Sequence, residues 1–244
     1  MTQFGNLPKR ESLLEAVTPV GTYGGVGHFV EYFGGADYDR NLWLHKNSDL
    51  GGGTGEGTTI DDGTCLNAWQ HKGGGVEMIT NSNQYGMTWL GMGDTQAFDK
   101  DGFVMISIAT RLTSDAGLLV GMTSNGRQNP RLTTNDASRI DFENASNPSS
   151  IKMRIKKDGS NGAHELWTSI SGTNGANGLK RYVYQIEGEG QRMRGSINNV
   201  LEVVYTTTAN YPDEDMSPYC GIYTRANTIE KCLWSYCECW NTGV

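Results

Sequence analysis

The segment Ile151–Lys156 has the clearest hydrophobic pattern in the chain, because apolar and basic residues alternate in it without a break. Successive side chains of a strand point to opposite faces, so this alternation predicts a β-strand with one dry and one wet face. We expect Met153 to lie in the core and Arg154 to point into water. The segment Phe103–Ala109 is instead apolar at nearly every position, which predicts a strand near the centre of a sheet with both faces covered.

Strand-length segments follow one another from Val76 to Trp240, and most are bounded by Gly, Asn, Asp or Pro. Many short strands separated by turns predict an all-β fold in which two antiparallel sheets pack as a sandwich. Residues 18–75 contain several glycine runs and no sustained helical periodicity, so we expect a loop-rich first third with short edge strands. The predicted strands are Val76–Thr80, Gly86–Met92, Phe103–Arg111, Leu118–Thr123, Arg139–Glu143, Ile151–Lys156, Glu165–Ile170, Arg181–Glu187, Gln191–Ile197, Leu201–Thr206, Tyr219–Thr224 and Cys232–Trp240.

The N-terminal residues 1–20 form a separate arm in this interpretation, and residues 21–244 form one sandwich domain. Ser12 and Glu15 have the spacing of a capping box, which predicts a short helix over residues 12–17. A sandwich need not bury an apolar arm on itself, so we expect the arm to dock on a neighbouring subunit. Alternatively, the short helix caps one open end of its own sandwich. The apolar residues expected to make the contact are Phe4, Leu7, Leu13, Leu14 and Val17.

Composition and charge narrow the set of partners. The formal net charge of the 244 residues is −7, and such a chain repels a phosphate backbone, so nucleic acid is not expected as a partner. The sequence has no signal-peptide pattern near its start and no apolar run of about 18 residues, so we expect a protein made in the cytoplasm, without a membrane partner. The 5 cysteines are odd in number, and we expect reduced thiols.

A hairpin carries a family resemblance. Asn198 and Asn199 lie between apolar segments, and asparagine tolerates the positive φ of a two-residue hairpin turn. The stretch Gln191–Tyr205, the crossing Asn210–Thr224 and the closing strand Cys232–Trp240 together resemble concanavalin A-like, laminin-G-like jelly-roll domains. The resemblance covers roughly residues 75–244, and Asn199 stands where the family's turn has glycine.

The segment from Tyr211 to Ala226 also resembles virion structural proteins of tailed bacteriophages that carry such a domain. This resemblance implies a non-enzymatic capsid decoration, head or tail-associated protein in the virion. It would act by adhesion to other virion proteins or to copies of itself as a homo-oligomer. The alternative is a carbohydrate-binding lectin module that recognises host-surface glycans, and a glycan hydrolase is the least favoured hypothesis.

The hydrolase hypothesis depends on one strand. Some β-glucan hydrolases of this fold carry Glu-x-Asp-x-x-Glu or Glu-x-Asp-x-Glu, which aligns three carboxylates on one strand face. This chain has Asp141 and Glu143, but Arg139 stands at the position of the nucleophile. Retaining chemistry then has no nucleophile on this strand, so we expect no enzyme. We interpret the three residues as a wet strand face with local ion pairing.

Other candidate chemistry is weaker. Acidic turns near Asp61, Asp62, Asp213 and Asp215 are candidates for Ca²⁺, although acidic turns are more often solvated, so no cofactor is expected. The cysteines lack the paired spacing of a zinc site, and the histidines form no catalytic or metal motif. Sugars stack on exposed aromatic rings, and the candidates for such a platform are Trp43, Trp69, Trp89 and Trp167.

Overall fold

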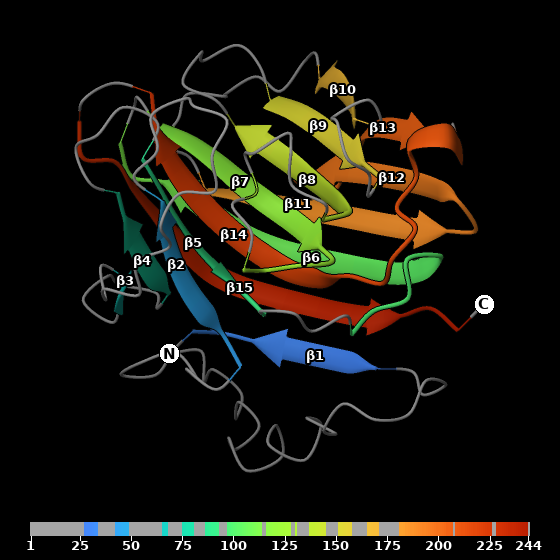
Figure 1. The fold of residues 1–244 in the computed structure, drawn as a ribbon, viewed down its shortest axis with the longest axis horizontal. Helices are drawn as coiled ribbons and strands as arrows, with labels where there is room; N and C mark the ends of the chain where they lie inside the picture. The colour runs from blue at the N-terminus through green and yellow to red at the C-terminus, as the bar shows by residue number, and fades with distance from the viewer. Residues whose placement is uncertain are drawn as a thin grey trace, which may run out of the picture.

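The structure is a computed structural model, and most of what it describes is β-strand. The described part of the chain forms two antiparallel sheets that pack face to face as a sandwich, which confirms the predicted fold class (Figure 1). The described residues are 27–33, 42–48, 65–67, 75–80, 86–92, 97–113, 116–127, 130, 137–144, 151–157, 165–170, 181–206, 208–225 and 228–243.

Sheet A, as we name it, has β6 (Gly102–Arg111) and β15 (Lys231–Asn241) at its centre. One side continues through β11 (Arg181–Glu189) and β12 (Arg192–Ile197) to the edge strand β13 (Val200–Tyr205). The other side of β15 pairs along part of its length with β4 (Val76–Ile79), which leads to β3 (Cys65–Asn67), and along another part with β1 (His28–Glu31).

Sheet B has β7 (Ala116–Thr123) and β14 (Ser217–Thr224) at its centre. From β7 it continues through β8 (Arg139–Asn144) and β9 (Ile151–Lys156) to β10 (Glu165–Ile170). From β14 it continues through β5 (Met87–Gly91) to β2 (Leu44–Ser48). A single-turn 3₁₀ helix, Thr208–Asn210, lies between β13 and β14.

The predicted strands are confirmed to within a few residues at their ends. Asn198 and Asn199 have φ angles of 52° and 66°, as the predicted hairpin turn between β12 and β13 requires. The segment Phe103–Ala109 lies in β6, which pairs on both sides, so its central position is confirmed. The first third of the chain contributes β1, β2 and β3, short strands on the margins of the sheets, as expected.

The hydrophobic core lies between the two sheets, and each strand supplies it from one face. On β9 the dry face is confirmed, because Ile151, Met153 and Ile155 are buried. The prediction for Arg154 is wrong: its side chain points away from the core, but only 1% of the residue is exposed. The alternation in β9 therefore identified its two faces correctly, but the second face is buried at Arg154 and Lys156 and exposed at Lys152.

The described cysteine side chains Cys220, Cys232, Cys237 and Cys239 are free thiols buried in the core. The Sγ atoms of Cys237 and Cys239 lie 4.0 Å apart on one face of β15. Burial, together with the neighbouring Cys237, raises the pKa of the Cys239 thiol, so this group packs as a small neutral apolar side chain.

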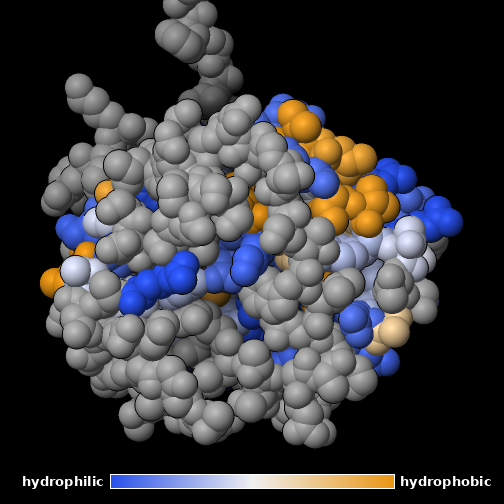
Figure 2. Space-filling view, turned by 90° about the horizontal axis from the view of Figure 1, so that it is seen from above, coloured by the Kyte–Doolittle hydropathy of each residue, from blue (hydrophilic) through white to orange (hydrophobic). Residues whose placement is uncertain are grey.

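The edge strand β13 exposes Val200, Leu201 and Val204, each of them at least half accessible to solvent. Figure 2 shows apolar surface gathered on the side of the sandwich where β13 lies in Figure 1. The predicted docking arm, with Phe4, Leu7, Leu13, Leu14 and Val17, lies outside the described residues. Within the described part of the chain, no helix has the length and apolar character needed to cross a membrane.

Candidate functional site

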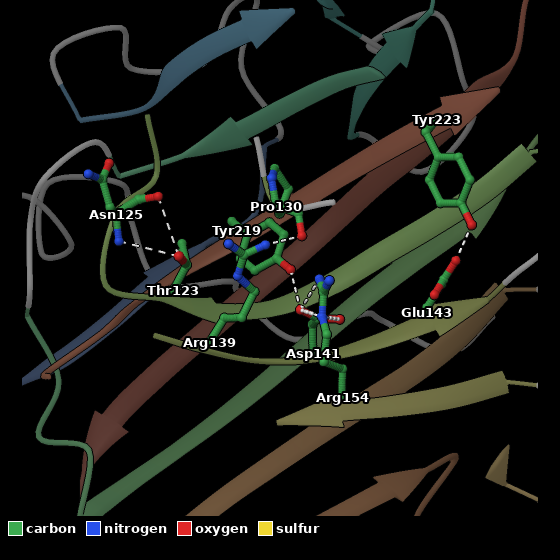
Figure 3. A network of polar contacts seen from close by, with 9 residues as sticks. All are labelled: Thr123, Asn125, Pro130, Arg139, Asp141, Glu143, Arg154, Tyr219 and Tyr223. Carbon is green, nitrogen blue, oxygen red and sulfur yellow. Dashed lines mark hydrogen bonds and ion pairs between the residues drawn. The ribbon is translucent and has the colours of Figure 1, made fainter. Parts of the chain in front are cut away.

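The outer face of sheet B, which points away from the core, carries a dense group of polar and aromatic side chains. The strand register places Tyr219 of β14 opposite Gly121 of β7, Gly121 opposite Asp141 of β8, and Asp141 opposite Arg154 of β9. Directly opposed residues of neighbouring strands share a face, so these side chains form one row across the sheet. Figure 3 shows this row from close by.

Asp141 is the centre of the row and is fully buried. Its Oδ2 atom accepts hydrogen bonds from Nη2 of Arg154 at 2.6 Å, from Nε of Arg154 at 3.0 Å and from the Tyr219 hydroxyl at 2.6 Å (Figure 3). Burial, reinforced by the negative Asp141, raises the pKa of the Tyr219 phenol well above its ordinary value. The phenol therefore remains a hydrogen-bond donor over the ordinary pH range.

A second tyrosine reaches the next carboxylate on the same strand. The Tyr223 hydroxyl donates a hydrogen bond to Oε1 of Glu143, and the Glu143 side chain is only partly buried (Figure 3). Both rings project from β14 across β7 to reach β8, and β7 has glycine beneath them at Gly117 and Gly121. A Cβ atom at Gly117 would lie 2.1 Å from two ring atoms of Tyr223, so any side chain there would displace the ring.

Gly117→Ala is therefore expected to lower the free energy of unfolding by about 1–3 kcal/mol, since the tyrosine must leave its place and its bond to Glu143. Urea unfolding of both proteins measures the loss. The matched control is Gly27→Ala, whose added Cβ would meet only Asn241 at an ordinary 3.5 Å. Equal stability of the Gly117 and Gly27 variants would contradict this description of the tyrosine.

Arg139 lies on the same face as Asp141 and Glu143 but is fully buried. Its guanidinium donates a hydrogen bond to the carbonyl of Pro130, in the connection between β7 and β8 (Figure 3). The same connection contacts β5, where the Trp89 indole donates to the carbonyl of Gly126 at 2.7 Å. The expectation of a wet strand face is therefore wrong for Arg139 and Asp141, and Asp141 forms its ion pair with Arg154 of β9, which is not one of the three residues expected to pair.

An apolar cluster lies beside the carboxylates on this face. It combines aromatic rings with two aliphatic side chains, and all its members are buried. The cluster packs beside the partly accessible Glu143, but its rings are covered and so are not an exposed platform for a sugar. The members are Met87, Trp89, Leu119, Tyr219 and Tyr223.

The other candidate aromatics are distributed differently. Trp43 packs in the core beside Trp234, so it is not a sugar platform. Trp89 lies on the outer face of sheet B but is buried there, so it is not an exposed sugar platform either. Trp69 lies outside the described residues, as does the side chain of Trp167 in β10.

Asp213 and Asp215, the two candidate calcium ligands that the structure describes, each bind other groups of the protein. Asp213 accepts a hydrogen bond from Ser138 and lies 3.6 Å from the Lys157 ammonium, while Asp215 accepts from the backbone N–H of Lys100. Asp61 and Asp62 lie outside the described residues. Among the residues that are described, no group of three or more His, Cys, Asp or Glu side chains could hold a metal ion.

Solved structures share this architecture over most of the chain. An endo-glucanase of glycoside hydrolase family 16 from Bacteroides ovatus aligns with a TM-score of 0.63 and 11% identity over 86% of this chain and 98% of its own. A laminarinase catalytic domain from Thermotoga petrophila gives 0.64 and 11% over 88% and 97%. A laminarinase from Flavobacterium gives 0.60 and 15% over 87% and 99%. No protein-family model and no curated protein matches the chain.

The fold is a concanavalin A-like jelly roll. The expectation of a non-enzymatic bacteriophage virion protein is wrong. The three structures that share this jelly roll are glycan hydrolases, and none of them is a virion protein. At 11–15% identity the likeness shows the fold alone.

Sequence reasoning named Asp141 and Glu143 but missed their partners on the jelly roll's outer face. The sequence does contain a pattern that predicts the partner of Asp141. Every second residue of β8 from Asp141 is acidic and every second residue of β9 is basic, and opposite charges on neighbouring strands favour pairs such as Asp141 with Arg154. A signal for the tyrosines was present as well, because Tyr219, Gly221 and Tyr223 alternate along β14. Their reach to β8 depends on the glycines of β7, which only the strand order reveals.

Proposed function

We propose that this chain is a glycoside hydrolase that acts on a polysaccharide bound beside Glu143 on the outer face of sheet B. Glu143 donates a proton to the leaving oxygen as the glycosidic C–O bond breaks, and a water molecule adds its hydroxyl to the anomeric carbon and returns a proton to Glu143. The observation that carries the proposal is the position of Glu143. It projects, partly accessible, from β8 of a jelly-roll sandwich, beside the aromatic cluster and hydrogen-bonded to Tyr223. The likeness of the fold to glucanases supports a glycan as the ligand.

Glu143 is favoured over Asp141 for proton transfer. Both oxygens of Asp141 are engaged by the Arg154 guanidinium, and Oδ2 also holds the Tyr219 hydroxyl. A carboxylate held in this way is fixed in place, so we assign to it the positioning of Tyr219 and of the sheet surface. Glu143 accepts from the Tyr223 hydroxyl and is partly accessible, and a general acid must be able to exchange its proton with the leaving group.

Glu143→Gln is expected to lower kcat by about 10²–10⁴-fold, since the amide cannot donate a proton as an acid does, while glycan binding persists. Release of reducing ends from a panel of neutral and acidic polysaccharides measures the activity, and affinity electrophoresis measures binding. Glu187→Gln is the matched control, because Glu187 is a partly buried glutamate on the outer face of sheet A, hydrogen-bonded to Gln185. A Glu143 variant as active as the wild type would overturn the assignment.

A second candidate is carbohydrate recognition without cleavage, and Arg139 favours it. Retaining hydrolysis uses two carboxyl groups about 5–5.5 Å apart, and Arg139 occupies the strand position from which the second one was expected. The same assays separate the candidates. Binding of a polysaccharide by the wild type, with no reducing ends released from it at high protein concentration, would select recognition.

A further inference from the structure

The outer face of sheet A is more accessible at its centre than the outer face of sheet B. On β6, a central strand of sheet A, Ile106 and Ile108 alternate with core residues, and both are partly exposed. The aromatic cluster on the outer face of sheet B is instead buried. A ligand therefore has access to side chains of sheet A that it lacks at the cluster of sheet B.

Five side chains from β1 and β15 gather on this outer face of sheet A. On β15, Cys237 and Cys239 point into the core. The residues that alternate with them point outward, and β1 pairs with this part of β15. We name the group the β1–β15 cluster, and its members are His28, Tyr32, Tyr236, Glu238 and Trp240.

Glu238 is the polar centre of the cluster, and its side chain is 23% exposed. Its Oε1 atom lies 2.8 Å from Nε2 of His28, and Oε2 accepts a hydrogen bond from the Tyr236 hydroxyl at 2.5 Å. A carboxylate only accepts, so the His28 nitrogen donates. Burial, reinforced by the hydrogen bond to Glu238, raises the pKa of the Tyr236 phenol, so this group remains a donor. The carboxylate is thus held from two sides and keeps lone pairs for further donors.

Aromatic rings lie on both sides of this carboxylate. Tyr32 is 56% exposed, and its ring centroid lies 5.2 Å from that of Tyr236. Trp240 is partly exposed and stands perpendicular to the His28 ring at a centroid distance of 6.1 Å. Tyr236 and Trp240 are four residues apart on one strand face, which is a span of about 13 Å. The cluster therefore has the length to contact a short oligosaccharide.

The chemistry of the cluster favours an uncharged glycan. Sugars stack their C–H faces on aromatic rings, and their hydroxyls donate to a fixed carboxylate. The cluster contains no Lys or Arg, so it has no strong positive charge to attract an acidic sugar. A second copy of this chain fits less well, because the centre of a protein–protein interface is depleted of charged side chains such as Glu238.

We propose that the β1–β15 cluster is a second glycan site, which binds a neutral polysaccharide without cleaving it. Tyr32 and Trp240 stack on sugar rings, and Glu238 accepts hydrogen bonds from sugar hydroxyls between them. The site lies on the other sheet from Glu143, so it anchors a polymer without occupying the place of cleavage. It goes beyond the proposed function and does not depend on it, because a protein that only recognises glycans would use the site in the same way.

Affinity electrophoresis in gels that contain laminarin, galactomannan or polygalacturonate tests the proposal. The Glu143→Gln protein serves as the parent, so that the polymer is not cut. We expect one of the two neutral polymers to retard it more strongly than polygalacturonate does. Adding Tyr32→Ala or Glu238→Gln should weaken this binding about tenfold and leave the melting temperature within a few degrees. Binding of the same polymer on sheet B does not hide the effect, because losing one of two linked sites lowers avidity.

Two further variants on sheet A are the matched controls, Leu201→Ala and Glu187→Gln. Leu201 of β13 is 56% exposed, as Tyr32 is, and the Glu187 side chain of β11 is 30% exposed. We expect both controls to bind like the parent. Equal binding by all four variants, or no retardation of the parent by a neutral polymer, would overturn the second site.

Two more readings separate the remaining explanations. Sedimentation velocity reports the oligomeric state, and a dimer that Tyr32→Ala converts to a monomer would show that this face joins two copies of the chain, which overturns the proposal. Release of reducing ends by the wild type tests the proposed function separately. A protein that releases them, but whose Tyr32 and Glu238 variants bind like the controls, keeps the proposed function and loses the second site.

Discussion

Arg154→Met is expected to lower the free energy of unfolding by about 3–5 kcal/mol, because it leaves the Asp141 carboxylate buried without its guanidinium partner. The ion pair is made at 2.6 Å, and both side chains are almost fully removed from water. Methionine has a similar length and fills much of the same space, so the loss is electrostatic and not a large cavity. Chemical unfolding followed by circular dichroism measures the effect.

Two further variants make this result specific. Lys152→Met changes an exposed base on the same strand and face, and we expect a change within about 0.5 kcal/mol. Asp141→Leu combined with Arg154→Met removes both charges, and we expect part of the stability to return, since an apolar pair of similar volume often replaces a buried ion pair without loss. A single Arg154 variant as stable as the Lys152 variant would refute the role of the pair.

Met153→Asp is expected to unfold the protein at ordinary temperature. Met153 lies in the core with no exposed surface, and an isolated carboxylate there costs more than the protein's typical margin of about 5–15 kcal/mol can absorb, unless it takes up a proton. Loss of the cooperative unfolding transition is the measurement. Met153→Leu should cost less than about 1.5 kcal/mol, and a cooperative Met153→Asp variant close to it in melting temperature would contradict the position of the core.

Much of the sheet structure follows from local pattern. β9 begins and ends at the predicted residues. Its two signals, the alternation of apolar and basic residues and the turn residues on either side, lie within a few positions of each other in the sequence. The hairpin at Asn198 is predicted for the same reason. The short strands β1, β2 and β3 are not separable from loops by sequence, since their pairing is made with strands such as β15 and β5, far along the chain.

The candidate site was predicted only in part, and Arg139, which was expected on a wet face and is buried, shows why. Alternation tells which residues share a face, but whether that face meets water depends on what folds over it. Here the connection between β7 and β8 contacts the face at two points: the Gly126 carbonyl accepts from Trp89, and the Pro130 carbonyl accepts from the buried Arg139. A long-range contact of this kind leaves no periodic signal in the sequence.

The strand order also has a consequence for how the protein is made. β14 and β15 each pair on both sides at the middle of their sheets, yet they are residues 217–224 and 231–241 and leave a ribosome after all the other described strands. Until then β4 and β5 lack their central partners. The nascent chain therefore holds unpaired strand edges until β14 and β15 emerge, so both sheets are completed by non-local pairing that depends on protection from aggregation.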